Sequence, residues 1–295
     1  MMMAFGGMLG LIGALPFVLV DDTHLSVTDA VFESISGLTT TGATVIVGLD
    51  TLPRSLLYYR QQLQWLGGMG IIVLAVAVLP MLGVGGLQLY LAEMPGPMKD
   101  AKLTPRIAET ALSLYKLYVA FTVAEILALR VAGMTWFEAQ CHAFSTLGTG
   151  GFSTRNASVG GFQSPAIEWI IIVFMFLAGA NFSLHYLVLT GRWKSYWEDE
   201  EFRFYVSIIL VSALLIGGSL LAVGFYAESG GTPRHTLFQV ISIMTTTGFG
   251  TQDYLQWPPL AHAVLLVLMA VGGCAGSAST AGFPAGGAGL ADGRA

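Results

Sequence analysis

The chain has 295 residues, of which 54% are hydrophobic and only 11% are charged, and its mean hydropathy is +0.69. That is more apolar surface than one soluble core can hide, so the composition predicts a polytopic membrane protein. The net charge of −5 arises from few charges, and the 13 Lys and Arg residues form no basic patch, which excludes a nucleic-acid-binding protein. Cys141 and Cys274 lack metal-binding or redox spacing, and we expect inert thiols.

Several apolar segments approach the length that crosses a bilayer as a helix, which is about 17 to 25 residues. We expect spans at 4–20, 63–82, 112–132, 167–189, 204–226 and 260–272, the last being short. We expect the first of them to be a true span and not a signal peptide, because no basic residue precedes it and no small-residue cleavage site follows it. The sequence therefore predicts an all-α protein that crosses the membrane several times.

Between successive spans, a half-apolar segment runs into a cluster of threonine and glycine. The first copy, at 32–43, reads FESISGLTTTGA, and the third, at 238–249, reads FQVISIMTTTGF; the two align without a gap. The second copy, CHAFSTLGTGGF at 141–152, fits the same frame with Gly148 and Gly150 in place of threonines. Such self-similarity indicates a duplicated structural unit.

About ten residues precede each cluster, too few to cross a bilayer as a helix. They can enter the membrane and return if the irregular turn is buried in protein or lines water. Each unit is therefore predicted to be a helix, a re-entrant pore helix, a filter loop and a second helix. We expect units at 1–87, 111–190 and 204–277, cytoplasmic connections at 88–110 and 191–203, and a flexible or foreign Gly/Ala tail at 278–295.

Threonine and glycine suit a pathway for alkali cations. Such an ion must exchange its hydration shell for protein oxygens, and backbone carbonyls supply them without the trapping strength of a carboxylate. Threonine adds a hydroxyl oxygen, and glycine permits backbone angles that turn successive carbonyls toward one axis. One cluster alone would more often be an ordinary loop or a helix contact, but three clusters in register favour an ion pathway.

The chain resembles the membrane subunits of the bacterial Trk-type potassium uptake systems, the TrkH family of the Trk/Ktr/HKT superfamily. The resemblance rests on the strings SGLTTTGAT at 36–44, QWLGGMG at 64–70, EMPGP at 93–97, GGFST at 150–154, TTGF at 246–249 and GGCAGS at 272–277. It covers the chain from about residue 8 to residue 277 and is specific in combination.

The resemblance implies four such units around one pseudo-fourfold pore, of which three are present here. It also implies potassium as the substrate with no further cofactor, a homodimer, a cytosolic nucleotide-binding regulatory subunit, and the bacterial inner membrane as the location. The family's ion-coordinating stretch matches Thr40, Thr41, Gly42, Thr149, Gly150, Gly151, Thr246, Thr247 and Gly248. Its gate, a glycine-rich break in the last helix, matches Gly272, Gly273, Gly276 and Ser277.

We therefore expect the pore-forming subunit of a potassium uptake system, in an incomplete chain that lacks the fourth unit. Whether uptake is channel-like or coupled to protons or sodium stays open. A non-conducting oligomerising or regulatory fragment is the alternative. An intramembrane enzyme is disfavoured and we expect no enzymatic activity, because no GxSxG, HExxH or P-loop string occurs.

Three polar residues stand within the expected spans, where such groups are often functional. Asn181 and His185 are four residues apart on one helical face, and we expect them to form hydrogen bonds between helices. We expect Glu125 to have a structural role, either paired with Lys116 or Arg130 or with its carboxylate extended toward the interface.

Overall fold

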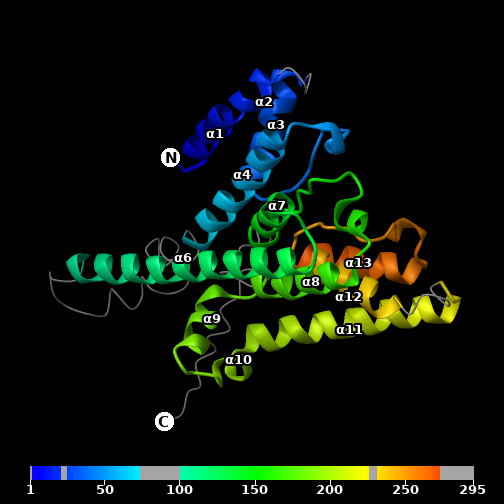
Figure 1. The fold of residues 1–295 in the computed structure, drawn as a ribbon. Coiled ribbons are helices and arrows are strands. Elements are labelled where there is room, and N and C mark those ends of the chain that lie inside the picture. The colour runs from blue at the N-terminus through cyan, green and yellow to red at the C-terminus, as the bar shows by residue number, and fades with distance from the viewer. Residues whose placement is uncertain (1, 21–24, 74–99, 226–230, 273–295) are drawn as a thin grey trace, which may run out of the picture.

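The computed structural model describes residues 2–20, 25–73, 100–225 and 231–272 (Figure 1). All regular secondary structure in these ranges is helical, and none of their residues forms a strand. The predicted all-α class is therefore confirmed. The helices follow one another in three sets, and each set contains one short helix that precedes a Thr/Gly cluster.

The first set comprises α1 (Met2–Gly13), α2 (Leu15–Leu19), α3 (Val27–Leu38), η2 (Leu49–Thr51) and α4 (Arg54–Val73). The second comprises α6 (Asp100–Val131), α7 (Trp136–Leu147), η4 (Ser158–Phe162), α8 (Pro165–Ala178) and α9 (Phe182–Leu189). After α10 (Ser195–Glu198), the third comprises α11 (Glu200–Val223), α12 (Thr232–Met244), η5 (Tyr254–Gln256) and α13 (Pro259–Val271).

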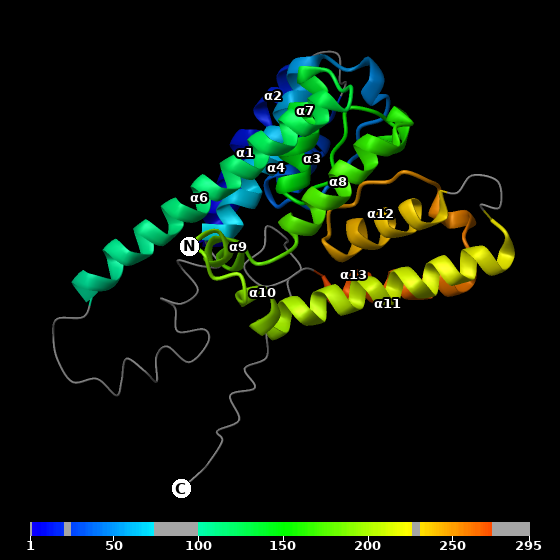
Figure 2. The ribbon, with the colours of Figure 1, turned by 60° about the horizontal axis from the view of Figure 1, so that its bottom comes forward.

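Two helices of the described chain are long and apolar enough to cross a membrane, namely the 111–131 part of α6 and the whole of α11. They run in the same general direction in Figures 1 and 2. The residues 7–19 of α1 and α2, and α13, are shorter apolar helices. The span predicted at 63–82 begins earlier, because α4 starts at Arg54, and its part after residue 73 lies outside the described residues.

The span predicted at 167–189 is not one continuous helix, because α8 and α9 meet at an angle of 98°. The break falls at Gly179, where a side chain would overlap Thr245 of the third Thr/Gly cluster and the hydroxyl of Tyr205. A new helix then begins at Asn181, whose Oδ1 accepts a hydrogen bond of 2.9 Å from the Ser183 N–H. Asn181 is thus an N-cap and not the interhelical donor that we expected.

His185 forms hydrogen bonds on both sides of this break. The sequence predicts that it forms hydrogen bonds between helices. Its Nε2 donates to the Leu177 carbonyl at the end of α8 at 2.8 Å. Its Nδ1 accepts from the Tyr196 hydroxyl of α10 at 2.6 Å. The buried imidazole therefore fixes the direction in which α9 leaves α8.

The three short helices are too short to cross a bilayer. α3 and α7 have 12 residues and α12 has 13, which at 1.5 Å per residue is about 18 to 20 Å against a hydrocarbon core of about 30 Å. α3 packs on α1 and α4, α7 on α6 and α8, and α12 on α11 and α13. Each short helix thus packs against two other helices of its own set, which suits a re-entrant helix buried in protein.

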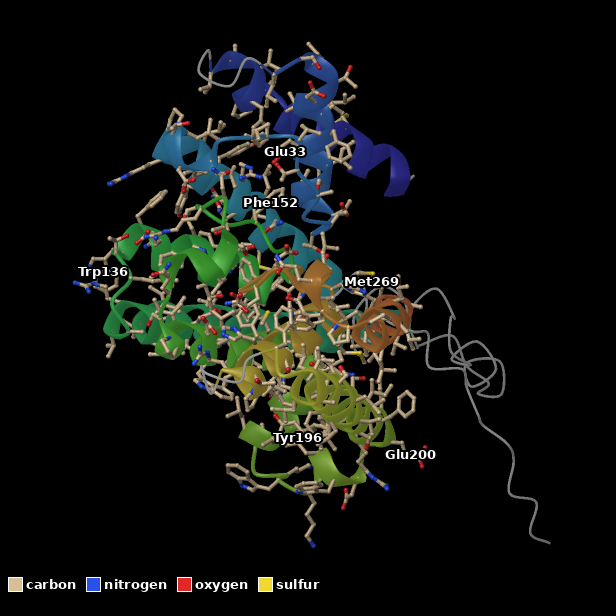
Figure 3. All side chains as sticks on the ribbon, turned by 90° about the vertical axis from the view of Figure 1, so that its right-hand side faces the viewer. Glu33, Trp136, Phe152, Tyr196, Glu200 and Met269 are labelled. Carbon is tan, nitrogen blue, oxygen red and sulfur yellow. The ribbon has the colours of Figure 1, made fainter. Side chains whose placement is uncertain are left out.

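The sets also touch one another in chain order, because α4 packs against α7 and α8 packs against α12. In Figure 3, Glu33 lies on the blue helices at the top, Trp136 on the green helices at the left and Glu200 on the yellow helix at the bottom. The structure does not address a fourth unit or the exact unit boundaries, which stay predictions.

Candidate functional site

The three Thr/Gly clusters adopt the same backbone conformation. Directly after each short helix one threonine has a left-handed backbone, with φ of 54° at Thr40, 51° at Thr149 and 57° at Thr246. Two residues later a glycine does the same, with φ of 74° at Gly42, 75° at Gly151 and 84° at Gly248. The repeat found in the sequence is therefore a repeat of backbone geometry.

Each short helix ends in a Schellman motif. In the first copy the Thr40 N–H donates to the Gly37 carbonyl at 3.0 Å and the Thr41 N–H to the Ser36 carbonyl at 2.9 Å. The second and third copies repeat both bonds with the same lengths. Glycine usually occupies the left-handed position of this motif, and a β-branched residue there stores roughly 1 to 3 kcal/mol of strain. The surrounding packing must therefore hold these threonines in place.

The clusters adjoin one another through their glycines. A side chain at Gly42 would overlap the carbonyl oxygen of Gly150 in the second loop, and one at Gly151 would overlap the carbonyl oxygen of Thr247 in the third. At Gly248 a Cβ would meet no described atom within 4 Å. The structure thus brings the three predicted filter segments together, first against second and second against third.

The threonine hydroxyls of these loops fall into two groups. The side chains of Thr40 and Thr149 are almost fully buried, and their hydroxyls have no hydrogen-bond partner in the described part of the chain. The Thr41 hydroxyl instead lies 2.8 Å from that of Thr39, which donates to the Ile35 carbonyl at 2.8 Å. The third loop repeats this pairing between Thr247 and Thr245. Thr40 and Thr149 therefore have hydroxyl oxygens to offer a dehydrated cation.

A serine at one position of the repeat holds the first and third loops to their own helices, a role that the sequence interpretation missed. Ser36 Oγ donates to the Ala43 carbonyl at 2.6 Å, and Ser242 Oγ donates to the Phe249 carbonyl at 2.7 Å. The second copy differs, because Ser145 Oγ donates to Gln64 Oε1 of α4 at 2.6 Å. The recurrence of serine in the same frame position was the available signal.

A second position of the repeat braces the chain after Gly42 and after Gly151. Glu33, fully buried in α3, accepts a hydrogen bond from the Thr44 hydroxyl at 2.8 Å. His142 occupies the same frame position in α7, and its Nε2 accepts from Ser153 Oγ at 3.0 Å while its Nδ1 donates to the Glu138 carbonyl at 2.8 Å. Both contacts connect a short helix to the segment that follows its Thr/Gly cluster.

An ion pair buried between α3 and α4 strengthens the first of these braces. Arg60 Nη2 lies 2.6 Å from Glu33 Oε1 and 2.9 Å from the Thr44 hydroxyl, and both charged side chains are fully buried. The Arg60 guanidinium also lies over the Phe152 ring of the second loop, 4.1 Å from its centroid. Glu33 and Phe152 appear one above the other in Figure 3. Arg60 therefore contacts the first and second loops at once.

The segments beyond the loops are also bonded to one another. Asn156 accepts from the Leu49 N–H at 3.0 Å and donates to Asp50 at 2.6 Å, joining the first to the second. The Gly160 N–H donates to the Gly250 carbonyl at 3.0 Å, joining the second to the third.

Glu138 connects the start of α7 to the segment after its loop. It forms a capping box with Thr135, and one carboxyl oxygen lies 2.7 Å from Arg155. Burial opposes ionisation of this carboxyl, but the hydrogen bonds from Arg155 and Thr135 outweigh it and lower its pKa. A lowered pKa means that the ionised form stabilises the folded state, fully above the ordinary carboxyl pKa and progressively less as the pH falls through the folded value.

We expect Glu138→Gln to be less stable than the unsubstituted protein at pH 7 by about 0.5 to 1 kcal/mol, because glutamine preserves the capping box but not the charge facing the partly exposed Arg155. The difference should shrink as the pH falls below the ordinary carboxyl pKa and should vanish once the pH has passed below the lowered pKa of Glu138 in the folded protein. Thermal unfolding in detergent across that range measures it. A difference that is unchanged at low pH would contradict this assignment of the charge.

Other predicted residues behave differently. Gly272 ends α13 with φ of +69°, while Gly273, Gly276 and Ser277 lie outside the described residues, so the gate stays a prediction. The predicted pairing or exposure of Glu125 is wrong, because its side chain is fully buried and forms no ion pair in the described chain. Cys141 is a buried free thiol, as expected, and Cys274 is not described.

Comparison with known proteins gives the family. The model of the TrkH cation transport proteins matches residues 2–282. The Trk system potassium uptake protein TrkH of Salmonella typhimurium strain LT2 is 53% identical over 274 residues, covering 92% of this chain and 57% of that protein. TrkG of Escherichia coli K12, from the same system, is 44% identical over 267 residues, or 90% of this chain and 55% of that protein.

Solved structures agree with these relatives. The crystal structure of the potassium transporter TrkH from Vibrio parahaemolyticus matches with a TM-score of 0.83 at 47% identity, covering 93% of this chain and 56% of that one. The chain thus spans a little more than half the length of the curated relatives that it matches. The family model matches this chain from residue 2 to residue 282, and the chain therefore belongs to the TrkH family of cation transport proteins.

Proposed function

We propose that this chain forms part of a potassium uptake pathway across the inner membrane of a bacterium, with residues 40–42, 149–151 and 246–248 as its selectivity filter. The observation that carries the proposal is the threefold backbone repeat, a left-handed threonine followed by a left-handed glycine, in three loops that adjoin through glycine and carbonyl contacts. Carbonyl and hydroxyl oxygens held in this way are suitable ligands for a dehydrated alkali cation.

The relatives support potassium as the ion, because they are named for potassium uptake and are 52 to 53% identical to this chain over the 274 matched residues. We propose a homodimer and a cytosolic nucleotide-binding regulatory subunit from the family resemblance alone. Potassium is the substrate in this proposal, and no cofactor is required. No observation on the described residues favours an enzyme, and the relatives are transporters.

The proposal is tested by rubidium influx into a host deficient in potassium uptake, with the protein expressed from its complete gene. We expect saturable influx that potassium competes. Thr40→Val and Thr149→Val should lower the apparent potassium affinity about tenfold, because each removes one hydroxyl ligand. Neither should lower thermal stability, because each removes a buried hydroxyl that has no partner in the described protein.

Thr190→Val is the matched control. The exposed Thr190 hydroxyl bonds to the Leu187 carbonyl at the end of α9, and Thr190 belongs to none of the three Thr/Gly loops. It should leave the affinity unchanged. Unaltered affinity in Thr40→Val and Thr149→Val, together with normal influx in the unsubstituted protein, would remove these hydroxyls from the pathway. Absence of potassium-competed influx in the unsubstituted protein would refute the proposed function itself.

A further inference from the structure

Gln64 of α4 occupies the space behind the second loop. Its side chain is fully buried, and its Nε2 donates to the Gly150 carbonyl at 2.7 Å. Its Oε1 accepts from Ser145 Oγ at 2.6 Å and from the Phe152 N–H at 3.2 Å. One amide from the first set of helices thus bonds to the last turn of α7, to the middle of the second loop and to the residue that follows it.

The position of Gln64 explains why the second copy of the repeat has glycines where the others have threonines. A Cβ at Gly150 would overlap the Gln64 side-chain amide, and one at Gly148 would lie 2.6 Å from the Gln64 backbone carbonyl oxygen. Neither position can carry a threonine beside Gln64. The second loop therefore lacks the pair of hydroxyls that the first loop has at Thr39 and Thr41.

The third loop provides an internal comparison. The Tyr118 hydroxyl donates to the Trp65 carbonyl of α4 at 3.1 Å, and the Tyr205 hydroxyl donates to the Phe176 carbonyl of α8 at the same length. This correspondence pairs Gln64 with Met175, the residues that directly precede the two carbonyls in the sequence.

Gly68 and Gly179 extend the correspondence, because each packs on one of these tyrosines and on the first residue of the next cluster, Gly148 or Thr245. Met175 is fully buried and has no amide to offer. The loop beside it keeps both threonines, whose hydroxyls lie 2.8 Å apart at Thr245 and Thr247. The second loop thus has a side-chain amide packed against it and no threonine pair, whereas the third loop has a threonine pair and no such amide.

From this alternation we infer that Gln64 is a positioning residue of the proposed filter, which replaces the threonine pair of the other loops and fixes the Gly150 carbonyl beside Gly42. The inference rests on the proposed function. The Gly150 carbonyl oxygen already accepts a hydrogen bond of 2.7 Å from the Gln64 amide, so one of its two lone pairs is occupied and the partly positive N–H beside it opposes an approaching cation. The Gly150 carbonyl should then be a weaker ion ligand than the Thr41 and Thr247 carbonyls, which hold the same position in the other two loops. The three loops should therefore coordinate the ion unequally.

The same carbonyl lies against Gly42 of the first loop, so a shift at Gly150 would pass directly to its neighbour. Losing the Gln64 donor frees the carbonyl to move and changes the spacing between the two loops. Potassium and sodium differ in the oxygen spacing that they require, so selectivity should respond more strongly than the amount of folded protein.

Gln64→Glu is the sharpest variant, because a carboxylate still accepts from Ser145 and Phe152 but cannot donate to Gly150. Gln64→Met reproduces the residue at Met175. Expressed from the complete gene, each should lower the potassium-to-sodium influx ratio roughly three- to tenfold, the effect of one net hydrogen bond. Gln61→Met is the matched control, because Gln61 is buried on the same helix and its amide has no partner in the described chain; its ratio should stay within about twofold.

A second test uses packing. Gly150→Ala should lower the ratio in the presence of Gln64, which it overlaps, but should add little to Gln64→Ala, which vacates that space. Unchanged ratios in Gln64→Glu and Gln64→Met, with normal influx, would overturn the inference alone. Loss of folded protein in both, with Gln61→Met unaffected, would overturn it in favour of a purely structural role. Absence of competed influx in the unsubstituted protein would overturn the proposed function and this inference with it.

Discussion

Gly42→Ser and Gly151→Ser are expected to lower the potassium-to-sodium influx ratio by tenfold or more. In each, the new Cβ would occupy the position of a backbone carbonyl oxygen in the adjoining loop, so that loop must move. The left-handed φ of both residues adds strain of roughly 1 to 3 kcal/mol for a residue other than glycine. Displacement of a carbonyl that ligates the ion should relax selectivity before it abolishes influx.

Gly248→Ser separates the two contributions. Its φ of 84° imposes similar strain, but its Cβ would meet no described atom within 4 Å. On these contacts we expect a smaller loss of selectivity than at Gly42 or Gly151. Gly218→Ser is the control, because Gly218 lies in α11 with open space around it and an ordinary helical backbone. Equal potassium-to-sodium influx ratios in all four variants and in the unsubstituted protein would contradict the assignment of these glycines to the filter.

Much of the site could be predicted from the sequence, because the repeat is local. A run of residues in one frame encodes the short helix, its Schellman end and the left-handed glycine, so aligning three copies was enough to find Gly42, Gly151 and Gly248. The helical class followed from composition, because only helices or closed barrels satisfy the backbone within lipid.

What the sequence could not predict depends on contacts between units. The departure at Gly148 and Gly150 was visible, but its cause, Gln64, lies more than 80 residues earlier and belongs to another set of helices. The span at 167–189 looked continuous because it contains no proline. The bend arises because Gly179 lies against the third loop and Asn181 caps a new helix.

Arg60→Met is expected to destabilise the protein by about 3 to 5 kcal/mol, because it leaves the carboxylate of Glu33 buried without its counter-charge. Glu33→Leu should cost a similar amount, since Arg60 would then be the uncompensated charge. Both side chains are fully buried, so neither can reach water without moving α3 against α4. Thermal unfolding in detergent should show both single variants well below the unsubstituted protein.

The double variant distinguishes stability from function. Removing both charges leaves an apolar site, so Glu33→Leu with Arg60→Met should recover most of the lost stability, as replacement of buried ion pairs often does. It should not recover selectivity, because Thr44 loses its hydrogen bonds to Glu33 and Arg60 and Phe152 loses the guanidinium that lies over its ring. If the double variant were as unstable as the sum of the two single ones, the pair would not be coupled. If it were stable and fully selective, the ion pair would support the fold alone and not the geometry of the loops.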